Sequence, residues 1–434
     1  MKHRFSVVLI LVALMTETQA QEPKTDNEIL AGADTRICQI RMGNLTVAVR
    51  DAKGKPIPGA RVRIEQTRHE FLFGCNIFML DRFPTKEENE QYKSRFAALL
   101  NFATLPLYWA GFEPERDRPQ YPRIEAMARW CREAGIITKG HPLVWNHSAG
   151  APRWLPSDPA EVQKRSNERV KACVERFKGL VDIFDVVNEA ADPLRPGFEN
   201  PVSDLIRKIG VEEFTRRPFC IAREANPTAL LLINDYRTDA KYEKVVQFLS
   251  VNGKRLYDVI GIQSHMHGGV WPMHRTWEVC ERYSRYGVPI HFTETTVLSG
   301  PNLGSGKYGE TTPELEEKQA REVVAFYTAI FSHPAVEAIT WWDFCDRGAW
   351  QKAPAGLLRK DLSPKPAYTA LLKKIKEDWW TRAEGRTNEQ GDLQVRVFFG
   401  THRVAVAAPD GRTLESEATV NRKQGQAACA VVMR

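Results

Sequence analysis

Between about residues 70 and 375, short apolar runs alternate with longer stretches that mix apolar and charged positions. This alternation is typical of parallel βα units, in which a buried strand is followed by a covering helix. The strands are expected at Phe71–Ile77, Phe102–Pro106, Ile136–His141, Ile183–Val187, Leu230–Asn234, Val259–Gln263, Pro289–Thr293 and Ile339–Trp342. Eight strands in a segment of this length favour a closed (β/α)8 TIM barrel over an open sheet.

The two ends of the chain follow a different pattern, in which apolar and polar residues alternate with a period of two. Leu45–Val49 and Leu393–Val397 both show it, and turn residues follow nearby. Each end alone has too few strands for a stable sheet. We therefore expect the two ends, residues 36–68 and 391–434, to pair into one small β-sandwich-like accessory domain beside a barrel of residues 69–378.

The first twenty residues have the features of a signal peptide. Lys2 and Arg4 precede the apolar run Phe5–Met15, and small residues follow at Thr18–Ala20. The apolar run is shorter than the roughly 20 residues that a membrane-spanning helix needs. We expect residues 1–20 to be removed, and a secreted or periplasmic monomer without a membrane span.

The charge distribution argues against a nucleic-acid-binding protein, and the cysteine spacing argues against a fold built on a framework of disulfides. The formal net charge is +7, but Lys and Arg are spread along the chain without the basic run that marks nucleic-acid binding. The eight cysteines are scattered and form no CxxC pair, so they are expected to be mostly buried small side chains, with no pairing that the sequence reveals.

Polar and aromatic residues gather where the expected strands end. They are His141, Glu189, Asn234, Gln263, Glu294 and Trp342. Enzymes built on this barrel place their chemistry at the carboxyl ends of the strands. The pattern therefore predicts an active site at that end.

Two of these residues are glutamates, each at the end of an apolar strand, where an unused charge is costly. Glu189 follows Asn188 within Asp185–Ala190, and Glu294 ends His291–Glu294. A retaining glycosidase needs two carboxyl groups about 5–5.5 Å apart, one as acid/base and one as nucleophile. The pair predicts a retaining β-glycoside hydrolase, which needs no cofactor.

The motifs resemble those of family 10 glycoside hydrolases, whose best-known members are endo-β-1,4-xylanases. The similarity covers most of residues 70 to 372 and rests on Lys139–Trp145, Asp185–Ala190, Ile233–Tyr236, Gly261–His265, Thr293–Glu294, Trp342, Trp350 and Pro364–Tyr368, in that order. The resemblance implies Glu189 as acid/base and Glu294 as nucleophile, acting on a β-1,4-linked plant polysaccharide or oligosaccharide of the xylan type. It also implies that His141, Trp145, Asn188, Gln263 and His265 shape the sugar subsite next to the cut.

Other side chains are expected to support this chemistry. His265 can hydrogen-bond Glu294 and hold it ionised, because a charge-assisted bond favours the anion. Tyr236 is expected in the binding site. The flat faces of Trp145, Trp342 and Trp350 suit pyranose rings, whereas Trp341 is expected in the core.

One stretch departs from the family pattern. Typical members carry Glu-Asn-Glu-Met-Lys-Trp after the second strand, and here Thr104–Trp109 reads Thr-Leu-Pro-Leu-Tyr-Trp. Asn146-His147 and Thr295-Thr296 replace the usual His-Ser and Leu-Asp pairs. The polar groups that grip the sugar on the non-reducing side are thus lost, while both glutamates remain.

Two alternatives stay open. A catalytically silent carbohydrate-binding protein would keep the barrel and read glycans with its tryptophans. A metal-dependent hydrolase would use histidines such as His265 with His267, or His141 with His147, as ligands. The first lacks its expected signature, the loss of a glutamate, and the second lacks accompanying acidic ligands.

Overall fold

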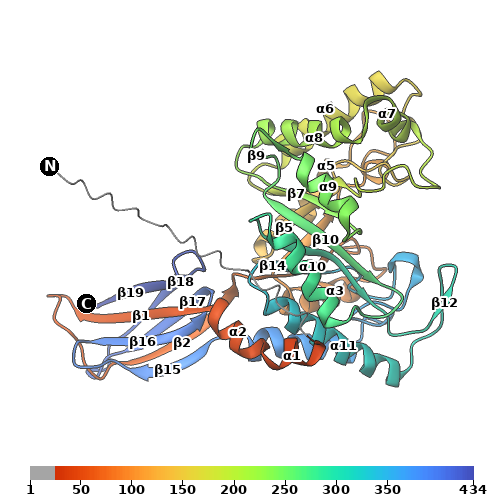
Figure 1. Ribbon diagram of the computed structural model, residues 1–434. Coiled ribbons are helices and arrows are strands. Elements are labelled where there is room, and N and C mark those ends of the chain that lie inside the picture. The colour runs from red at the N-terminus through yellow and green to blue at the C-terminus, as the bar shows by residue number, and fades with distance from the viewer. Residues whose placement is uncertain (1–24) are drawn as a thin grey trace, which may run out of the picture.

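The computed structural model describes residues 25–434, so the expected signal peptide lies outside the described residues. Eight parallel strands close into a barrel in which each strand pairs with its neighbours (Figure 1). In barrel order the strands are β3 (Leu72–Asn76), β4 (Phe102–Pro106), β5 (Ile137–His141), β6 (Ile183–Asn188), β7 (Leu230–Asp235), β10 (Val259–Met266), β11 (Ile290–Val297) and β14 (Val336–Trp341). The predicted (β/α)8 TIM barrel is confirmed.

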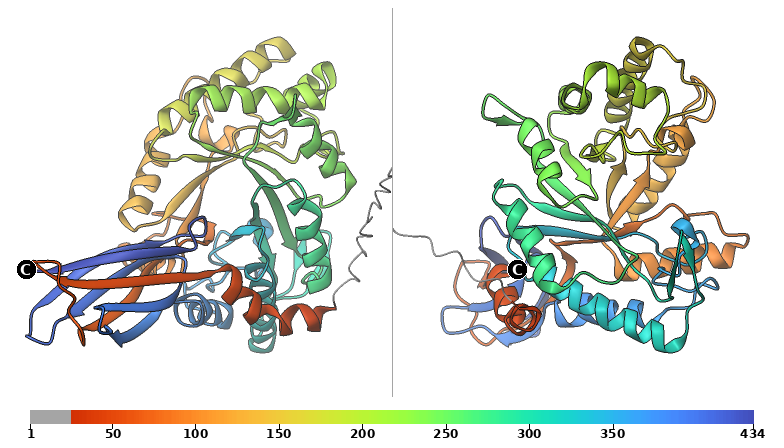
Figure 2. Two further views of the ribbon diagram at one scale, coloured as in Figure 1. Left: turned by 60° about the vertical axis from the view of Figure 1, so that its left-hand side comes forward. Right: turned by 45° about the vertical axis from the view of Figure 1, so that its right-hand side comes forward.

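Helices surround the barrel (Figure 2). The longer ones are α3 (Lys86–Leu99), α5 (Tyr121–Glu133), α6 (Pro159–Phe177), α7 (Pro201–Ile209), α8 (Val211–Ala225), α9 (Ala240–Phe248), α10 (Met273–Ser284), α11 (Pro313–Phe331) and α12 (Pro366–Lys373). Short elements complete the loops, namely α4 (Trp109–Phe112), β8 (Ser250–Val251), β9 (Lys254–Arg255), β12 (Asn302–Gly304), β13 (Lys307–Tyr308), η1 (Trp350–Lys352) and η2 (Lys374–Asp378). Local sequence sets the helix starts. At α3, for example, Thr85 and Glu88 form a capping box that satisfies the first free amides.

The two ends of the chain form a second unit of two sheets beside the barrel (Figure 1). One sheet is β16 (Asp392–Phe398), β1 (Met42–Asp51) and β19 (Gln426–Met433), and the other is β15 (Arg382–Arg386), β2 (Arg61–His69), β17 (Gly400–Ala407) and β18 (Thr413–Val420). Both cover one apolar core that includes Leu45, Val47, Ile64, Val404 and Val431. The accessory sandwich built from both ends is therefore present, as predicted.

Its limits differ from the expected ones. β15 begins at Arg382, ahead of residue 391. Helices α1 (Asp26–Ala31) and α2 (Ala33–Ile40) occupy the start of the described chain, although a β segment was expected from residue 36. These helices pack against α10 and α11 of the barrel, and their buried Ile29 and Ile37 join the barrel's core.

Arg41 joins the sandwich to the base of the barrel, the end where the strands begin. Its buried guanidinium donates to the backbone carbonyls of Phe331, His333 and Val336, each at 2.8 Å. Because three carbonyls of the barrel accept from this one guanidinium, they fix the relative position of the two units. The opposite end of the barrel is left open for a site.

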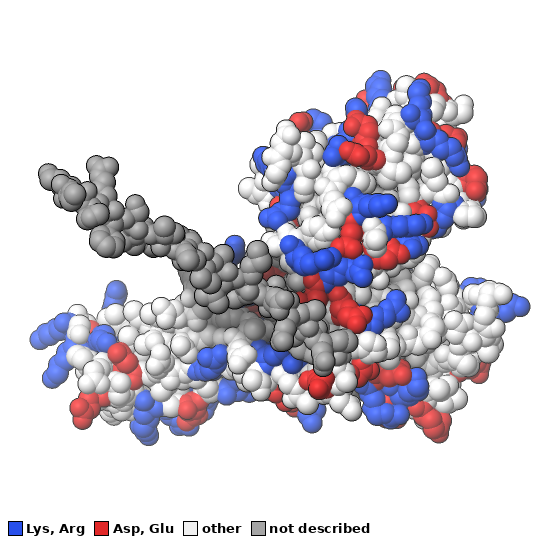
Figure 3. Space-filling model, in the orientation of Figure 1, with Lys and Arg blue, Asp and Glu red and all other residues white. Residues whose placement is uncertain are grey.

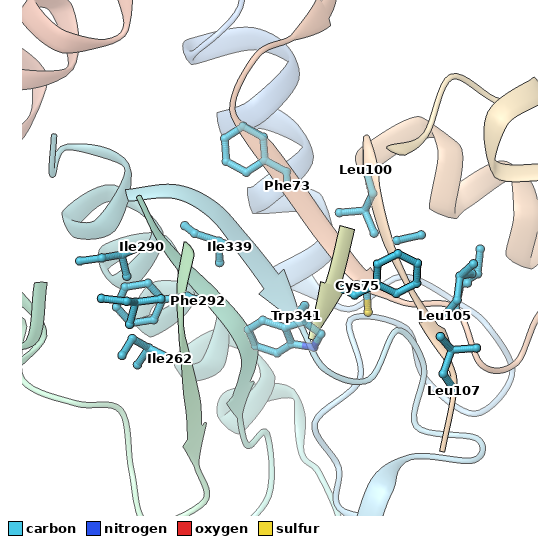
Figure 4. Packing of buried hydrophobic residues seen from close by; sticks show 14 of the residues in the cluster. Phe73, Cys75, Leu100, Leu105, Leu107, Ile262, Ile290, Phe292, Ile339 and Trp341 are labelled. Carbon is cyan, nitrogen blue, oxygen red and sulfur yellow. The ribbon is translucent and has the colours of Figure 1, made fainter. Parts of the chain in front are cut away.

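Large apolar side chains fill the barrel and the space between its strands and helices (Figure 4). Phe73, Phe292, Ile339 and Trp341 belong to this cluster, and Trp341 is fully buried with its indole N–H donating to the carbonyl of Ala355 at 3.0 Å. All eight cysteines are free thiols, and six of them are buried. The core is thus held by packing rather than by disulfides.

Positive and negative side chains are interspersed on the face in Figure 3. That face therefore has no single basic field for a polyanion. Across residues 25–434, no helix combines the length and the apolar character that crossing a bilayer requires.

Candidate active site

A cleft of about 1010 Å³ opens at the carboxyl ends of the barrel strands. It brings together ten of the side chains that the sequence singled out, namely His141, Trp145, Asn188, Glu189, Tyr236, Gln263, His265, Glu294, Trp342 and Trp350. Several other lining residues were not predicted from the sequence, among them Asn76, Phe78, Arg195, Trp271, Arg275 and Asp343. Most of these lie on loops or at strand ends outside the motifs.

Glu189 directly follows β6 and is only 7% exposed. Its backbone has a φ of +60°, a left-handed conformation that is uncommon for a residue with a β-carbon, and its amide donates to the carbonyl of Asn234 at 2.8 Å. The carboxylate accepts from the indole N–H of Trp145 at 3.1 Å and from the amide of Gln263 at 3.3 Å. Arg195 forms an ion pair with the same carboxylate.

Glu294 lies within β11 and is 4% exposed. Its Oε1 accepts from Nδ2 of Asn234 at 2.8 Å, and its Oε2 lies 3.1 Å from Nε2 of His265. Nε2 of His141 is 3.7 Å from Oε1. The expected contact between His265 and Glu294 is therefore present in the structure.

Three side-chain amides connect the two glutamates. Oδ1 of Asn188 accepts from Asn234 at 2.9 Å and from Gln263 at 3.1 Å. The amide nitrogen of Asn234 also donates to Glu294, and that of Gln263 also donates to Glu189. Thr293 donates to Oδ1 of Asn234 at 2.5 Å, which fixes how that amide is turned. Both carboxylates are thus oriented by a single buried network.

The surroundings move the pKa values of the two carboxyls in opposite directions. Burial raises the pKa of Glu189, and the nearby charge of Glu294 adds to this, although Arg195 opposes it. Burial also acts to raise the pKa of Glu294, but His141 and His265 outweigh it and hold that pKa below its usual range. Pairs of carboxyls separated in this way divide acid and nucleophile roles between them.

A buried charged group beneath the cleft fixes His141. Oδ2 of Asp185 lies 2.6 Å from Nζ of Lys139 and 2.7 Å from Nδ1 of His141, and all three side chains are buried. Burial acts to raise the pKa of Asp185, but Lys139 and His141 outweigh it and lower that pKa. The ionised Asp185 orients the imidazole so that Nε2 faces the cleft, 3.1 Å from the hydroxyl of Tyr108.

Aromatic rings form the walls of the cleft. Trp145 stacks on His147 with ring centroids 4.3 Å apart, and the ring of Trp342 meets the edges of His141 and His265. Trp350 is 43% exposed at the rim, as expected for a stacking surface. Such faces match the C–H faces of sugar rings.

The altered stretch 104–109 contributes little to the cleft. Leu105 and Leu107 are fully buried. Trp109 does not line the cleft, and its Nε1 donates to Glu113 over 2.8 Å. Only Tyr108 lines the cleft. The cleft thus has no gripping carboxylate, amide or lysine from this stretch.

Within residues 25–434, no three His, Cys, Asp or Glu side chains converge as a metal-binding group. His265 and His267 instead contact the ring of Trp350, at 4.7 and 5.2 Å between centroids.

Comparison with known proteins decides the family. The model of the family described as Glycosyl hydrolase family 10 matches residues 70–374, which is most of the chain. The chain belongs to this family. Among solved structures, the barrel is similar to xylanase 10B from Thermotoga petrophila RKU-1 in complex with xylobiose, with a TM-score of 0.59, 26% identity, and coverage of 71% of this chain and 95% of that one.

The curated relatives extend the similarity beyond the barrel. Anti-sigma-I factor RsgI6 of Acetivibrio thermocellus is 28% identical over 93% of this chain and 50% of its own length. Endo-1,4-beta-xylanase 1 of Arabidopsis thaliana is 25% identical over 85% of this chain and 37% of its own length. The chain therefore spans half or less of the length of these two relatives.

Proposed function

We propose that this protein is a retaining glycoside hydrolase that cleaves β-1,4-linked, xylan-type polysaccharides or oligosaccharides by double displacement. Glu189 serves as acid/base and Glu294 as nucleophile. The observation that carries the proposal is the pair of buried glutamates, held in one amide network, with pKa values displaced in opposite directions. Membership of family 10 and the similarity to a xylanase holding xylobiose support the substrate class.

The chemistry follows from these positions. Glu294, kept ionised by His265 and His141, attacks the anomeric carbon, while the protonated Glu189 gives its proton to the leaving oxygen. Glu189, now ionised, then takes a proton from a water molecule whose oxygen attacks the anomeric carbon, and the bond between the sugar and Glu294 breaks. The amide of Asn188 and the rings of Trp145 and Trp342 hold the sugar in place during both steps.

Replacement of each glutamate by alanine tests the assignment. We expect Glu294→Ala to abolish turnover of every substrate. We expect Glu189→Ala to retain activity on aryl glycosides, whose leaving groups need no proton, and added azide to accelerate release from the enzyme. Glu224→Gln, at an exposed position on α8, is the matched control and should be unchanged.

The stereochemistry of the product separates this proposal from its rivals. NMR during the first minutes should show the β-anomer, because two inversions give net retention. An α-anomer as first product would contradict Glu294 as nucleophile. Binding of xylo-oligosaccharides without any hydrolysis would identify a silent carbohydrate-binding protein instead.

A further inference from the structure

Arg195 lies in the cleft beside the proposed acid/base. Its loop follows β6, and its guanidinium forms an ion pair with Oε2 of Glu189 while Nη1 donates to the carbonyl of Asp192 at 3.0 Å. The central carbon of the guanidinium lies 3.7 Å from the ring centre of Phe198 and 5.1 Å from that of Tyr236. Two aromatic faces thus fix the plane of a cation that points into the site.

Arg195 pairs with a single carboxylate. Within residues 25–434, its only ion pair is with Glu189. The side chain of Asp192 is within 4 Å of Arg237 and Lys241 instead, and that of Asp235 accepts from the backbone amides of Ala191 and Arg237. The pairing of Arg195 therefore depends on the ionised state of one carboxylate.

In the proposed mechanism, Arg195 loses this anionic partner when the glycosidic bond is cleaved. Glu189 must carry a proton when the substrate is cleaved, and a neutral carboxyl no longer balances the guanidinium. The side chain of Arg195 is only 21% exposed, so an unpaired charge there is costly. An anion carried by the substrate would restore the balance and leave Glu189 free to hold its proton.

We propose that Arg195 recognises a carboxylate on the sugar at the leaving-group side of the cleft, so that the preferred substrate is an acidic oligosaccharide that bears a uronic acid. This inference rests on the proposed function, because the leaving-group side is defined by Glu189 as acid. A guanidinium offers five N–H donors in a plane that matches a carboxylate, and in Arg195 only part of that set is engaged. Arg275, an exposed cation that lines the same cleft over the ring of Trp271 at 4.7 Å, adds positive charge and has no ion pair of its own in the described chain.

The test measures binding and turnover separately. Binding is measured by calorimetry on Glu189→Gln protein, whose neutral side chain stands in for the protonated acid and cannot donate a proton to the leaving sugar. Three ligands are compared: a glucuronic-acid-bearing xylo-oligosaccharide, its methyl ester and the unsubstituted oligosaccharide. We expect the acid to bind about 10- to 100-fold more tightly than its ester, as for a hydrogen-bonded charge. In the same background, Arg195→Gln should reduce this ratio to about one.

The controls isolate the guanidinium. Arg237→Gln removes a cation next to β7 that pairs with Asp239 outside the cleft, and should leave the ratio unchanged. Because each ratio compares two ligands on one protein, a loss of folded material cancels. An acid-to-ester ratio near one in the parent, an unchanged ratio in Arg195→Gln, or equally tight binding of free glucuronate would each overturn the inference. Turnover of the same ligands by the unmodified protein tests the proposed function independently, since binding can prefer the acid even where nothing is cleaved.

Discussion

Oγ1 of Thr296 lies 2.9 Å from Nδ1 of His265, on the far side of the imidazole from Glu294. Typical family members place an aspartate at position 296, so a neutral hydroxyl here takes the place of a charge. The Thr296 hydroxyl can donate to Nδ1 or accept from it, and either bond holds the ring with Nε2 toward Glu294. The threonine thus orients the imidazole without adding a negative charge nearby.

We expect Thr296→Val to lower kcat/KM by about 10-fold, in line with the loss of one buried hydrogen bond. Donation to Glu294 weakens in the variant, so the pKa of Glu294 rises. Because Glu294 acts as the anion, activity is lost as pH falls through its pKa, and the acidic limb of the pH profile should move to higher pH. Ser264→Ala is the control, since it removes a hydroxyl bonded to Thr295 on the same strand pair without touching Glu294. Identical acidic limbs in parent and Thr296→Val would refute the role of the hydroxyl.

The buried carboxyl of Asp235 should make stability depend on pH. Burial raises its pKa to about 7, against 3.8 for an ordinary aspartate. The folded protein therefore keeps a proton that the unfolded chain releases, and this stabilisation is fully present below about pH 4 and lost as pH rises through 7. Glu189 and Asp343, whose pKa values are also raised, act in the same direction.

Thermal unfolding between pH 4 and 8 measures this effect. We expect Asp235→Asn to melt lower at all pH values, because its amide cannot accept both backbone N–H groups, but to lose melting temperature less steeply as pH rises. Parallel curves for the two proteins would show that Asp235 does not titrate in this range.

The sandwich core should depend on residues from both ends of the chain. Leu45 of β1 is fully buried there, and β1 pairs with β16 on one side and β19 on the other. We expect Leu45→Ala to lower the free energy of unfolding by about 2–5 kcal/mol and to open residues 391–434 to proteolysis. Thr46→Ala, on the opposite face of the same strand, should cost far less. Equal protease resistance in the two variants would argue for independent segments.

Plain linear xylan should be a poor substrate. With only Tyr108 of the stretch 104–109 in the cleft, two or three polar contacts to sugar are missing, which corresponds to about 10²- to 10⁴-fold in affinity on the non-reducing side. We expect kcat/KM on unsubstituted xylohexaose to be far below that on decorated xylo-oligosaccharides. Even, efficient cleavage of the plain hexamer would show that the altered stretch does not limit binding.

The barrel was predictable because its strands are apolar runs whose last residues are polar. The ends of the individual strands were harder to predict. β10 and β11 continue to Met266 and Val297, because these strands stay largely buried beyond the motifs. β15 was missed because Arg382–Arg386 contains one apolar side chain and a glycine, and it is a strand only through pairing with β2.

The site was predictable where residues end strands, and not where they lie on loops. Glu189, Glu294 and Gln263 follow from position and motif. Arg195 and Asp343 do not, because an arginine in a polar loop and an aspartate after Trp342 read as surface charge. Only the fold reveals that Arg195 reaches Glu189 and that Asp343 accepts from the amide of Trp350 at 3.1 Å.

The left-handed backbone at Glu189 also bears on how such a protein changes over generations. A side chain there is disfavoured by roughly 1–2 kcal/mol relative to glycine, and the buried carboxyl adds a desolvation cost. Glycine at this position would relax both, so the inert protein should be the more robust one. When selection for turnover ceases, random substitution therefore favours a more stable barrel that still binds sugars but no longer cleaves them. Recovery of activity would then require a substitution that lowers stability.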